Sequence, residues 1–571
     1  MPILSFYSAT RVIDMENICV NDDIVLQSES NPPSEIMDSL TPAFSLADVL
    51  IDVLDLPRKL FLIFLVAAWL FAILEFFSWW CRAEHVVGPL RFVFNTLLVT
   101  WSIVVPSYFL FFALRMKRVN PNVPLPTHWR VAVITTRAPS EPFEVVKHTL
   151  EAMLSQRYPH DTWLADEDPT EEVYEWCRAH GVRVSTRKNI EAYHRDCWPR
   201  RTKCKEGNLA YFYDQIGYLH YDIVVQLDAD HIPESGYLDA MLRPFVLESV
   251  GYVSAPSICD KNAKLSWAAR GRLYSEAVMH GPLQCGYTNG FAPLCIGSHY
   301  AVRTSALREI GGLGPELAED HTTTLMMNSH GWRGVHALDA IAHGDGPPTI
   351  ADCLTQEFQW SRSLMIVLLS LLPRYWKGLS CGKRIQFLFS ELWYPLFALS
   401  MLMGILLPLL AIIWNQPWVN VKYIDFLLHT LPLLCLSVAI PAFMKHAAIL
   451  RPATAPLFSW EAALFQILRW PWVVYGSLMG VRMAIYPSTV EFRVTPKGAL
   501  RQRSLSWKVL APCIAVLAVT FTPTLLVYDA GAAKGYYFFL IIIQIIYVAA
   551  LAGMVLVHRH EVSKASNSHR L

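Results

Sequence analysis

The sequence is short of charge and has no charge imbalance. Only 17% of its 571 residues are charged, 48 basic and 48 acidic, whereas 53% are apolar. Soluble globular proteins usually carry about 25% charged residues, so a wholly soluble protein is not expected. Nucleic acid is not expected as the main partner, because phosphate binding needs a concentrated positive face.

Several common motifs are also missing. The 12 cysteines are scattered and form no CxxC pair, so we expect reduced thiols in a cytosolic domain and no zinc site. Neither a GxxxxGK[ST] loop nor a GxGxxG loop occurs, which argues against an ATPase and a dinucleotide enzyme. The polar, acidic residues 1–57 are unlike a secretory signal peptide, and part of them has the composition of a disordered tail.

Long apolar stretches are what the sequence has in excess. A bilayer is crossed by about 20 mostly apolar residues, and six stretches have that length, namely 60–80, 92–114, 392–414, 426–444, 509–528 and 535–557. A buried core helix could explain one of them but not all six. Basic residues flank the second and third spans, so the region between these spans is predicted to be cytosolic. The flanking residues are Arg115, Lys117, Arg118, Arg374, Lys377, Lys383 and Arg384.

A seventh apolar stretch, residues 458–485, contains Glu461, Arg469 and Arg482. We predict an amphipathic helix in the cytosolic interface there, because a seventh span would place the basic segment after it outside. The predicted segments are an acidic tail (1–57), two transmembrane helices (58–118), a cytosolic domain (119–350), an interfacial segment (351–385), two transmembrane helices (386–444), an interfacial helix and loop (445–508), two transmembrane helices (509–557) and a tail (558–571). The expected location is the plasma or inner membrane, with the cytosolic domain and both termini inside.

The predicted cytosolic domain alternates between strand and helix patterns. Apolar runs of strand length occur at 131–136, 163–165, 182–184 and 223–227, and residues 143–157 have apolar side chains at helical spacing. This alternation predicts an α/β domain with a mostly parallel sheet and helices on both faces. Ligands of such sheets bind beyond the carboxyl ends of the strands.

Acidic clusters stand at two of these strand ends. Residues 166–168 follow one strand, and Asp228-Ala229-Asp230 follows another. A single Asp there can simply cap the next helix, but two clusters on one sheet edge favour a ligand site. A DxD pair suits Mg²⁺ or Mn²⁺, which complete their coordination with substrate phosphates, and a nucleoside diphosphate would fit.

Two further groups follow in the sequence. Glu319-Asp320 opens a predicted helix and could supply a general base, although acidic residues also favour helix N-termini for their own sake. In residues 356–360, Trp360 is flanked by amides that could bind a sugar ring, although a lone Trp there would be a membrane-interface anchor. Glu391 begins the third span and either lines a polar path or lies at headgroup level.

In this order and spacing, these groups resemble family 2 glycosyltransferases that build polysaccharides at membranes, with cellulose synthases as the closest type and curdlan, chitin and hyaluronan synthases as relatives. The matching stretches are 163–168, Lys205-Glu206-Gly207-Asn208-Leu209 (KxGNL), Asp228-Ala229-Asp230 (DxD), 296–298 with 303–312, Ala318-Glu319-Asp320 (TED), 356–360 (QxxRW) and 492–497 (FxVTxK).

The resemblance implies a GT-A fold and a role for each matching residue. The nucleotide-sugar would be held by Asp166, Lys205, Asp228, Gln356 and Gln359. The Mg²⁺ or Mn²⁺ ion would be bound by Asp230 and Asp228. The general base would be Asp320, and the acceptor sugar would contact Trp360 and Glu319. The gating loop over the nucleotide would comprise Phe492, Val494, Thr495 and Lys497.

The sequence departs from the family at Gln359, where the family has Arg, and Arg362 is a candidate replacement. The first strand also ends in Thr135-Thr136-Arg137-Ala138 instead of the usual PTYNE. The implied function is a processive inverting transferase that makes a β-glucan from UDP-glucose and exports it. The alternatives are a chitin- or hyaluronan-type synthase using UDP-N-acetylglucosamine, a non-processive enzyme that adds one sugar to a lipid, and an inactive transporter or scaffold.

Overall fold

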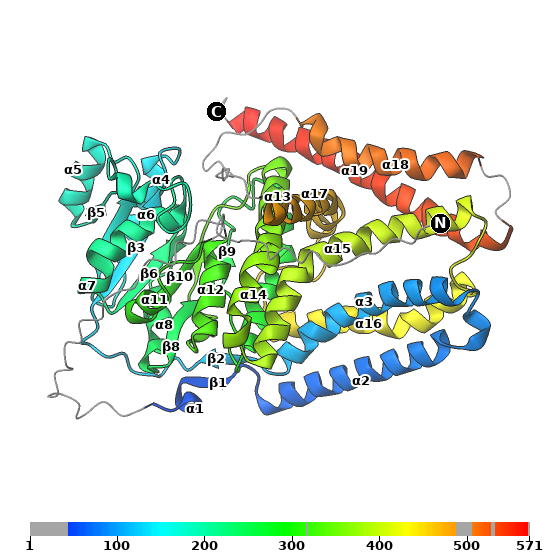
Figure 1. The fold of residues 1–571 in the computed structure, drawn as a ribbon, viewed down its shortest axis with the longest axis horizontal. Helices are drawn as coiled ribbons and strands as arrows, with labels where there is room; N and C mark the ends of the chain where they lie inside the picture. Colours follow the sequence, from blue (N-terminus) through cyan, green and yellow to red (C-terminus); the bar gives the residue numbers. More distant parts are fainter. Residues whose placement is uncertain (1–43, 316–317, 487–504, 527–530, 569–571) are drawn as a thin grey trace, which may run out of the picture.

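The computed structural model describes residues 44–315, 318–486, 505–526 and 531–568. An α/β domain forms one end of an elongated molecule, and long helices form the other end (Figure 1).

The α/β domain is built on a seven-stranded sheet with the order β11-β8-β10-β6-β3-β4-β5. Only β10 runs antiparallel to its neighbours, so the sheet is mostly parallel, as predicted. The strands are β3 (Val131–Arg137), β4 (Asp161–Asp166), β5 (Arg183–Ser185), β6 (Ile223–Leu227), β8 (Val250–Ser254), β10 (His299–Arg303) and β11 (Arg333–His336). The four predicted strands thus correspond to β3, β4, β5 and β6.

Helices cover both faces of this sheet. Successive side chains of a strand point to opposite faces, and β3 accordingly contributes Val131 and Val133 to one buried cluster and Ala132 and Ile134 to another. The first cluster is closed by α4 (Phe143–Leu154), α5 (Glu171–His180) and α8 (Tyr237–Leu242). The second is closed by α6 (Lys205–Phe212), α11 (Thr304–Glu309) and α12 (Glu319–Ser329).

The last part of the predicted N-terminal tail is folded. Helix α1 (Leu46–Val49) leads into β1 (Leu50–Asp52), which pairs with β2 (Lys117–Val119). Val49 and Leu50 are buried in the core of the α/β domain. Long-range strand pairing and burial therefore order this segment, and local composition gave no sign of it.

Smaller elements complete the domain. A second sheet has the order β7-β12-β9, with strands Ile232–Pro233, Ala342–His343 and Ser257–Ile258. Short helices are α7 (Tyr218–His220), α9 (Trp267–Ser275), α10 (Gln284–Tyr287) and α14 (Leu372–Tyr375). Single 3-10 or π-helical turns lie at Ala83–His85, Glu191–Tyr193, Tyr213–Gly217, Arg243–Val246, Met279–Leu283, Val367–Leu371, Trp376–Gly378 and Gly531–Ala533.

The described residues include six helices that are long and apolar enough to cross a membrane, which confirms the predicted number. They are α2 (Leu56–Trp80), α3 (Pro89–Ala113), α15 (Cys381–Ile413), α16 (Tyr423–His446), α18 (Trp507–Leu526) and α19 (Gly535–Ser568). Helix α15 has 33 residues and is therefore about 50 Å long, whereas the apolar core of a bilayer is about 30 Å thick. Its first turns extend beyond such a core and reach the α/β domain.

Helix α17 (Trp460–Ile485) is not among these six helices. It packs on α13 (Ile350–Ile366) and on α9, at the junction between the α/β domain and the long helices (Figure 1). A buried ion pair joins α17 to α13, because Arg469 Nη1 lies 2.9 Å from Glu357 Oε2. One of the three charges that argued against a seventh span, Arg469, thus fastens α17 to the helix that carries Gln356 and Trp360, and a second, Glu461, pairs with Arg270 on α9.

Candidate active site

The site lies where β6 ends and the antiparallel strand β10 begins. Leu227 pairs with His299, so the residues after β6 lie opposite Gly297 and Ser298, which precede β10. The backbone N–H of Asp228 donates to the carbonyl of Ser298 over 2.7 Å. Two segments that are far apart in the sequence therefore form one edge of the sheet.

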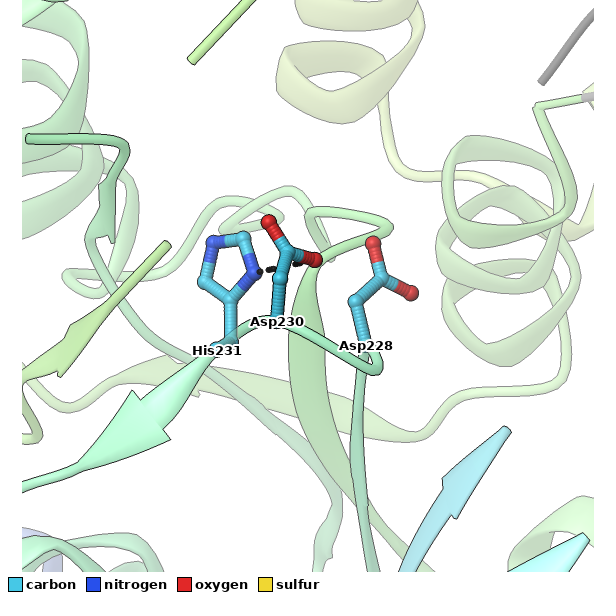
Figure 2. Close-up of side chains that lie close together, drawn as sticks. All are labelled: Asp228, Asp230 and His231. Atoms are coloured by element: carbon cyan, nitrogen blue, oxygen red, sulfur yellow. Dashed lines mark ion pairs between the residues drawn. The ribbon is translucent and has the colours of Figure 1, made fainter. Parts of the chain in front are cut away.

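Three side chains at this edge can hold a metal ion. The ligand atoms of Asp228, Asp230 and His231 all lie within 4.8 Å of one another (Figure 2). Carboxylate oxygens fit Mn²⁺ or Mg²⁺, and the additional imidazole nitrogen favours a transition-metal ion such as Mn²⁺ over Mg²⁺. Burial opposes a charge on His231, but the nearby carboxylate of Asp230 outweighs it and raises the pKa of the imidazole to about 10. A bound cation would take the place of that proton.

His231 was missed by the sequence analysis, although it directly follows the DxD pair. The pair itself is held by its surroundings, since the backbone N–H of Asp345 donates to Asp230 Oδ2 over 2.8 Å. Lys261 Nζ donates to the backbone carbonyl of Asp230 over 3.2 Å. The loops around residues 261 and 345 thus fix Asp230.

Lys205 and Gly297 bring the DxD pair and the expected base together. Lys205 Nζ donates to Asp228 Oδ1 over 2.7 Å and to the carbonyl of Gly297 over 2.5 Å. A Cβ at Gly297 would lie 3.2 Å from Asp320 Oδ2, so the carboxylate rests directly on this glycine. Asp228 and Asp320, 92 residues apart in the sequence, therefore border the same small region.

The first turn of α12 carries two carboxyl groups, the buried Glu319 and the partly exposed Asp320. Loss of solvent contact raises the pKa of both groups, and for Glu319 the charge of Asp320 adds to the effect. The backbone N–H of His321 donates to Asp320 Oδ1 over 2.7 Å and opposes the shift at Asp320. A carboxylate with a raised pKa that solvent and substrate can still reach is suited to act as a general base near neutral pH.

The KxGNL stretch contributes the side chain of Lys205 to this site, and Gly207 and Asn208 support it. A Cβ at Gly207 would lie 2.0 Å from the carbonyl oxygen of Arg201, so only glycine fits there. Asn208 Nδ2 donates to the carbonyl of Ala165, near the end of β4. These contacts hold the N-terminus of α6 against the sheet and so place Lys205.

Asp166 lies at the same sheet edge but is engaged with its own surroundings. It ends β4, two strands from β6, which corresponds to about 10 Å. Its Oδ2 lies 2.8 Å from Arg137 Nη1, and its Oδ1 accepts from the backbone N–H of Asp168. Arg137 belongs to residues 135–138, where this sequence differs from the family pattern. The ion-pair partner of Asp166 is therefore one of the residues that differ.

Gln356 and Trp360 lie on one face of α13 and contact a residue that the sequence analysis missed. Arg272, on α9, donates from Nη1 to Gln356 Oε1 over 2.5 Å, and its guanidinium carbon lies 4.2 Å from the centre of the Trp360 ring. Its Nε donates to Glu276 Oε1 over 3.2 Å. Arg272, a cation from another helix, therefore lies against Trp360.

Arg362, the candidate replacement for the missing family Arg, lies elsewhere. It is two residues beyond Trp360, which is about 200° around a helix, and its guanidinium lies over the ring of Phe358 at 5.3 Å. Gln359 is buried. Arg272, not Arg362, stands beside the aromatic ring.

Glu391 neither lines an open path nor lies exposed at headgroup level. Its side chain is fully buried, and Oε1 lies 2.5 Å from His321 Nε2. Its partner is His321 on α12, which neither expectation included. The expected gating-loop residues Phe492, Val494, Thr495 and Lys497 lie outside the described residues.

Sequence comparison gives the class of protein to which the sheet and its acidic edge belong. Residues 223–444 match the family described as glycosyl transferase family group 2, so the chain contains a family 2 glycosyltransferase domain. This match includes Asp228, Asp230, Asp320 and Trp360.

More specifically, the chain is similar to bacterial cellulose synthases. It is 23% identical over 398 residues to the cellulose synthase 1 catalytic subunit (UDP-forming) of Komagataeibacter xylinus, covering 66% of this chain and 48% of the relative. It is 24% identical over 281 residues to the cellulose synthase catalytic subunit of Xanthomonas axonopodis pv. citri, covering 47% and 36%. The chain thus spans about half the length, or less, of these curated relatives.

Two solved structures are also similar. A mannosyltransferase from Pyrobaculum calidifontis has 13% identity and a TM-score of 0.38, covering 74% of this chain and 99% of that one. A glucosyl-3-phosphoglycerate synthase from Mycobacterium tuberculosis has 16% identity and a TM-score of 0.28, covering 44% and 81%.

Proposed function

We propose that the protein is a processive, inverting, metal-dependent glycosyltransferase that extends a polysaccharide from a UDP-sugar and passes it across the membrane. The observation that carries the proposal is the meeting of Asp320 and Asp228 at Lys205 and Gly297, beside Asp230 and His231. This edge belongs to a domain that continues into six apolar helices. We place that domain and both termini in the cytosol, because basic residues flank the second and third spans.

Asp320 is the base of the proposed reaction. It takes the proton of the acceptor hydroxyl while that oxygen forms the new bond to C1 of the donor sugar. The bond from C1 to the diphosphate oxygen breaks on the opposite side, so UDP leaves with the bonding electrons and the configuration at C1 inverts. Lys205 and Asp228 orient the diphosphate side of the donor. Asp230, Asp228 and His231 would hold a divalent cation, which would supply positive charge for the leaving diphosphate.

The remaining predicted residues have roles on either side of this centre. Trp360 stacks on the acceptor sugar, Glu319 lies beside the acceptor, and Gln356 and Gln359 lie near the diphosphate. On the nucleotide side, Asp166 holds the end of β4 in place through Arg137. Phe492, Val494, Thr495 and Lys497, which match the gating-loop motif in sequence, are proposed to contact the bound nucleotide.

UDP-glucose is the proposed donor and a β-glucan the proposed product, because the similar proteins are named as cellulose synthases. The test is UDP release by the purified chain in detergent, with UDP-glucose, UDP-N-acetylglucosamine and other UDP-sugars, with and without Mn²⁺. We expect turnover of UDP-glucose only with metal, none in Asp320→Asn, and a polymeric product. A product of one sugar on a lipid would overturn processivity, and turnover of another UDP-sugar alone would overturn the donor. No UDP release from any donor would overturn the proposed activity.

A further inference from the structure

A buried ion pair joins the helix of the expected base to a long apolar helix. His321 directly follows Asp320 on α12, and its Nε2 lies 2.5 Å from Oε1 of Glu391 on α15. Glu391 is fully buried, and His321 is 8% exposed. The ring of Phe387, one turn before Glu391, meets the imidazole edge-on at 5.9 Å. The pair is thus enclosed by its own two helices.

His321 is the cation that this buried carboxylate requires. Among the described residues, Glu391 Oε2 has no hydrogen-bond partner, so the imidazole alone compensates the carboxylate. A buried carboxylate without a cation would be costly. Burial opposes a charge on His321, but Glu391 and then Asp320 outweigh it and raise the pKa of the imidazole.

Few other charged groups face the imidazole. On α12 itself these are Asp320 and Glu319, and from α6 Lys205 reaches the same carboxylates. Helix α14 and the turn after it contact α12 at its opposite end, where Tyr375 packs near His330 and Gly378 rests on Ser329. Strand β8 also meets that end, where Asn328 Nδ2 donates a hydrogen bond to the hydroxyl of Tyr252. Strand β11 follows α12 directly in the chain. That end lies about 12 Å from His321.

We propose that His321 and Glu391 are positioning residues for the base: the pair fastens the start of α12 to α15 and keeps a positive charge next to Asp320. The proposal rests on the proposed role of Asp320. Because a neighbouring cation favours the ionised form of a carboxyl group, the pair keeps Asp320 deprotonated to lower pH than burial alone would allow.

The sign of the expected effect follows from this arrangement. In His321→Asn the cation is gone. In Glu391→Gln the imidazole loses its partner, so the pKa of His321 falls and the ring becomes neutral. Both changes raise the pKa of Asp320. The acidic limb of the kcat/KM profile, where the base gains its proton, therefore moves to higher pH.

Gln386 provides a matched control on the same helix. Its side chain exchanges two hydrogen bonds with the backbone of Ala292, of 2.9 and 2.7 Å, and so also ties α15 to the α/β domain. It carries no charge. The variant Gln386→Ala loosens the same junction and leaves the charge beside Asp320 intact.

The experiment measures UDP release against pH for the full-length protein and four variants: His321→Asn, Glu391→Gln, their double variant and Gln386→Ala. We expect the acidic limb to rise by about 1 pH unit in both single variants. Below the limb this is a tenfold loss of rate. The acidic limb of the double variant should shift no further than the limb of either single variant, because each single change already removes the positive charge of His321. Gln386→Ala should lower the melting temperature and leave the limb in place.

An unshifted limb in either single variant, or an equal shift in Gln386→Ala, would overturn the charge role of the pair. Thermal unfolding tests the pair without turnover, since coupled residues give non-additive melting shifts in the two single variants and the double variant. Additive shifts would overturn the pair itself. An inactive wild type with non-additive melting shifts would instead contradict the proposed function.

Discussion

The two ends of the site are built in different ways. At the metal end, Asp228, Asp230 and His231 stand on the loop that leaves a fully buried strand, and backbone groups and the side chains of Lys205 and Lys261 bond to this loop. At the aromatic end, Gln356 and Trp360 stand on a helix and contact the side chain of Arg272 from another helix. The metal end therefore lies on a loop at a sheet edge, and the aromatic end lies on two helices that pack together.

Among the variants that separate the two ends, removal of the base should have the largest effect on turnover. Asp320→Asn keeps the size and shape of the side chain, but the amide cannot accept the proton of the acceptor hydroxyl. We expect kcat to fall by about 10²–10⁴-fold, with UDP affinity within a factor of two of the wild type. The measurement combines UDP release with calorimetric UDP binding. A loss of UDP binding equal to the loss of turnover would mean that Asp320 belongs to the donor site.

The second variant tests whether His231 belongs to the metal end. His231→Ala removes one of three candidate ligands, and even the loss of a residue that only supports a ligand weakens metal binding by about 10–100-fold. We expect at least that increase in the Mn²⁺ concentration needed for half-maximal UDP binding. His343→Ala is the matched control, because His343 pairs with Asp260 and Glu234 outside the metal group. An unchanged Mn²⁺ requirement in His231→Ala would leave the two aspartates as the ligands.

The third variant acts on the aromatic end. Arg272→Gln removes the cation over Trp360 and the charged hydrogen bond to Gln356. A cation–π contact and a charged hydrogen bond are together worth about 2 kcal/mol, so we expect kcat/KM to fall about 30-fold. The Mn²⁺ requirement should not change if the two ends are independent.

Arg270→Gln is the matched control for Arg272, because Arg270 lies on the same helix and pairs with Glu461 on α17. We expect less than a twofold change in its kcat/KM. An equal loss in both variants would mean that α9 matters only through its packing.

The smallest effect is expected at the point where the base meets the sheet edge. Gly297→Ala adds a Cβ 3.2 Å from Asp320 Oδ2, so the carboxylate must shift by a few tenths of an ångström. Small displacements of reacting groups reduce rates, and we expect about a threefold to tenfold loss of kcat with unchanged KM. Gly290→Ala is no suitable control, because Gly290 has a positive φ of 87°. Ser298→Ala tests the neighbouring position instead.

The sheet and the position of its acidic edge could be predicted because their signals are local. A run of apolar residues followed at once by Asp228-Ala229-Asp230 is both a buried strand and its acidic end. The six apolar helices could be predicted from length alone. Such features need no knowledge of which distant residue lies opposite.

The contacts that could not be predicted all join distant parts of the chain. Glu391 and His321 are 70 residues apart, and Arg272 and Gln356 are 84 residues apart. The folding of residues 44–52 likewise depends on pairing with β2. A charged residue in isolation has several possible environments, and only the packing of helices decides among them.

Helix α15 is continuous from the α/β domain into the apolar helices (Figure 1), but it contains Pro395 and Pro408. Pro395 lies four residues after Glu391, between the ion pair with His321 and the turns that are long enough to cross a bilayer. A proline inside a helix removes one backbone hydrogen bond and is a common site of kinks. Pro395 is therefore the place where α15 can bend without moving the turn that holds His321.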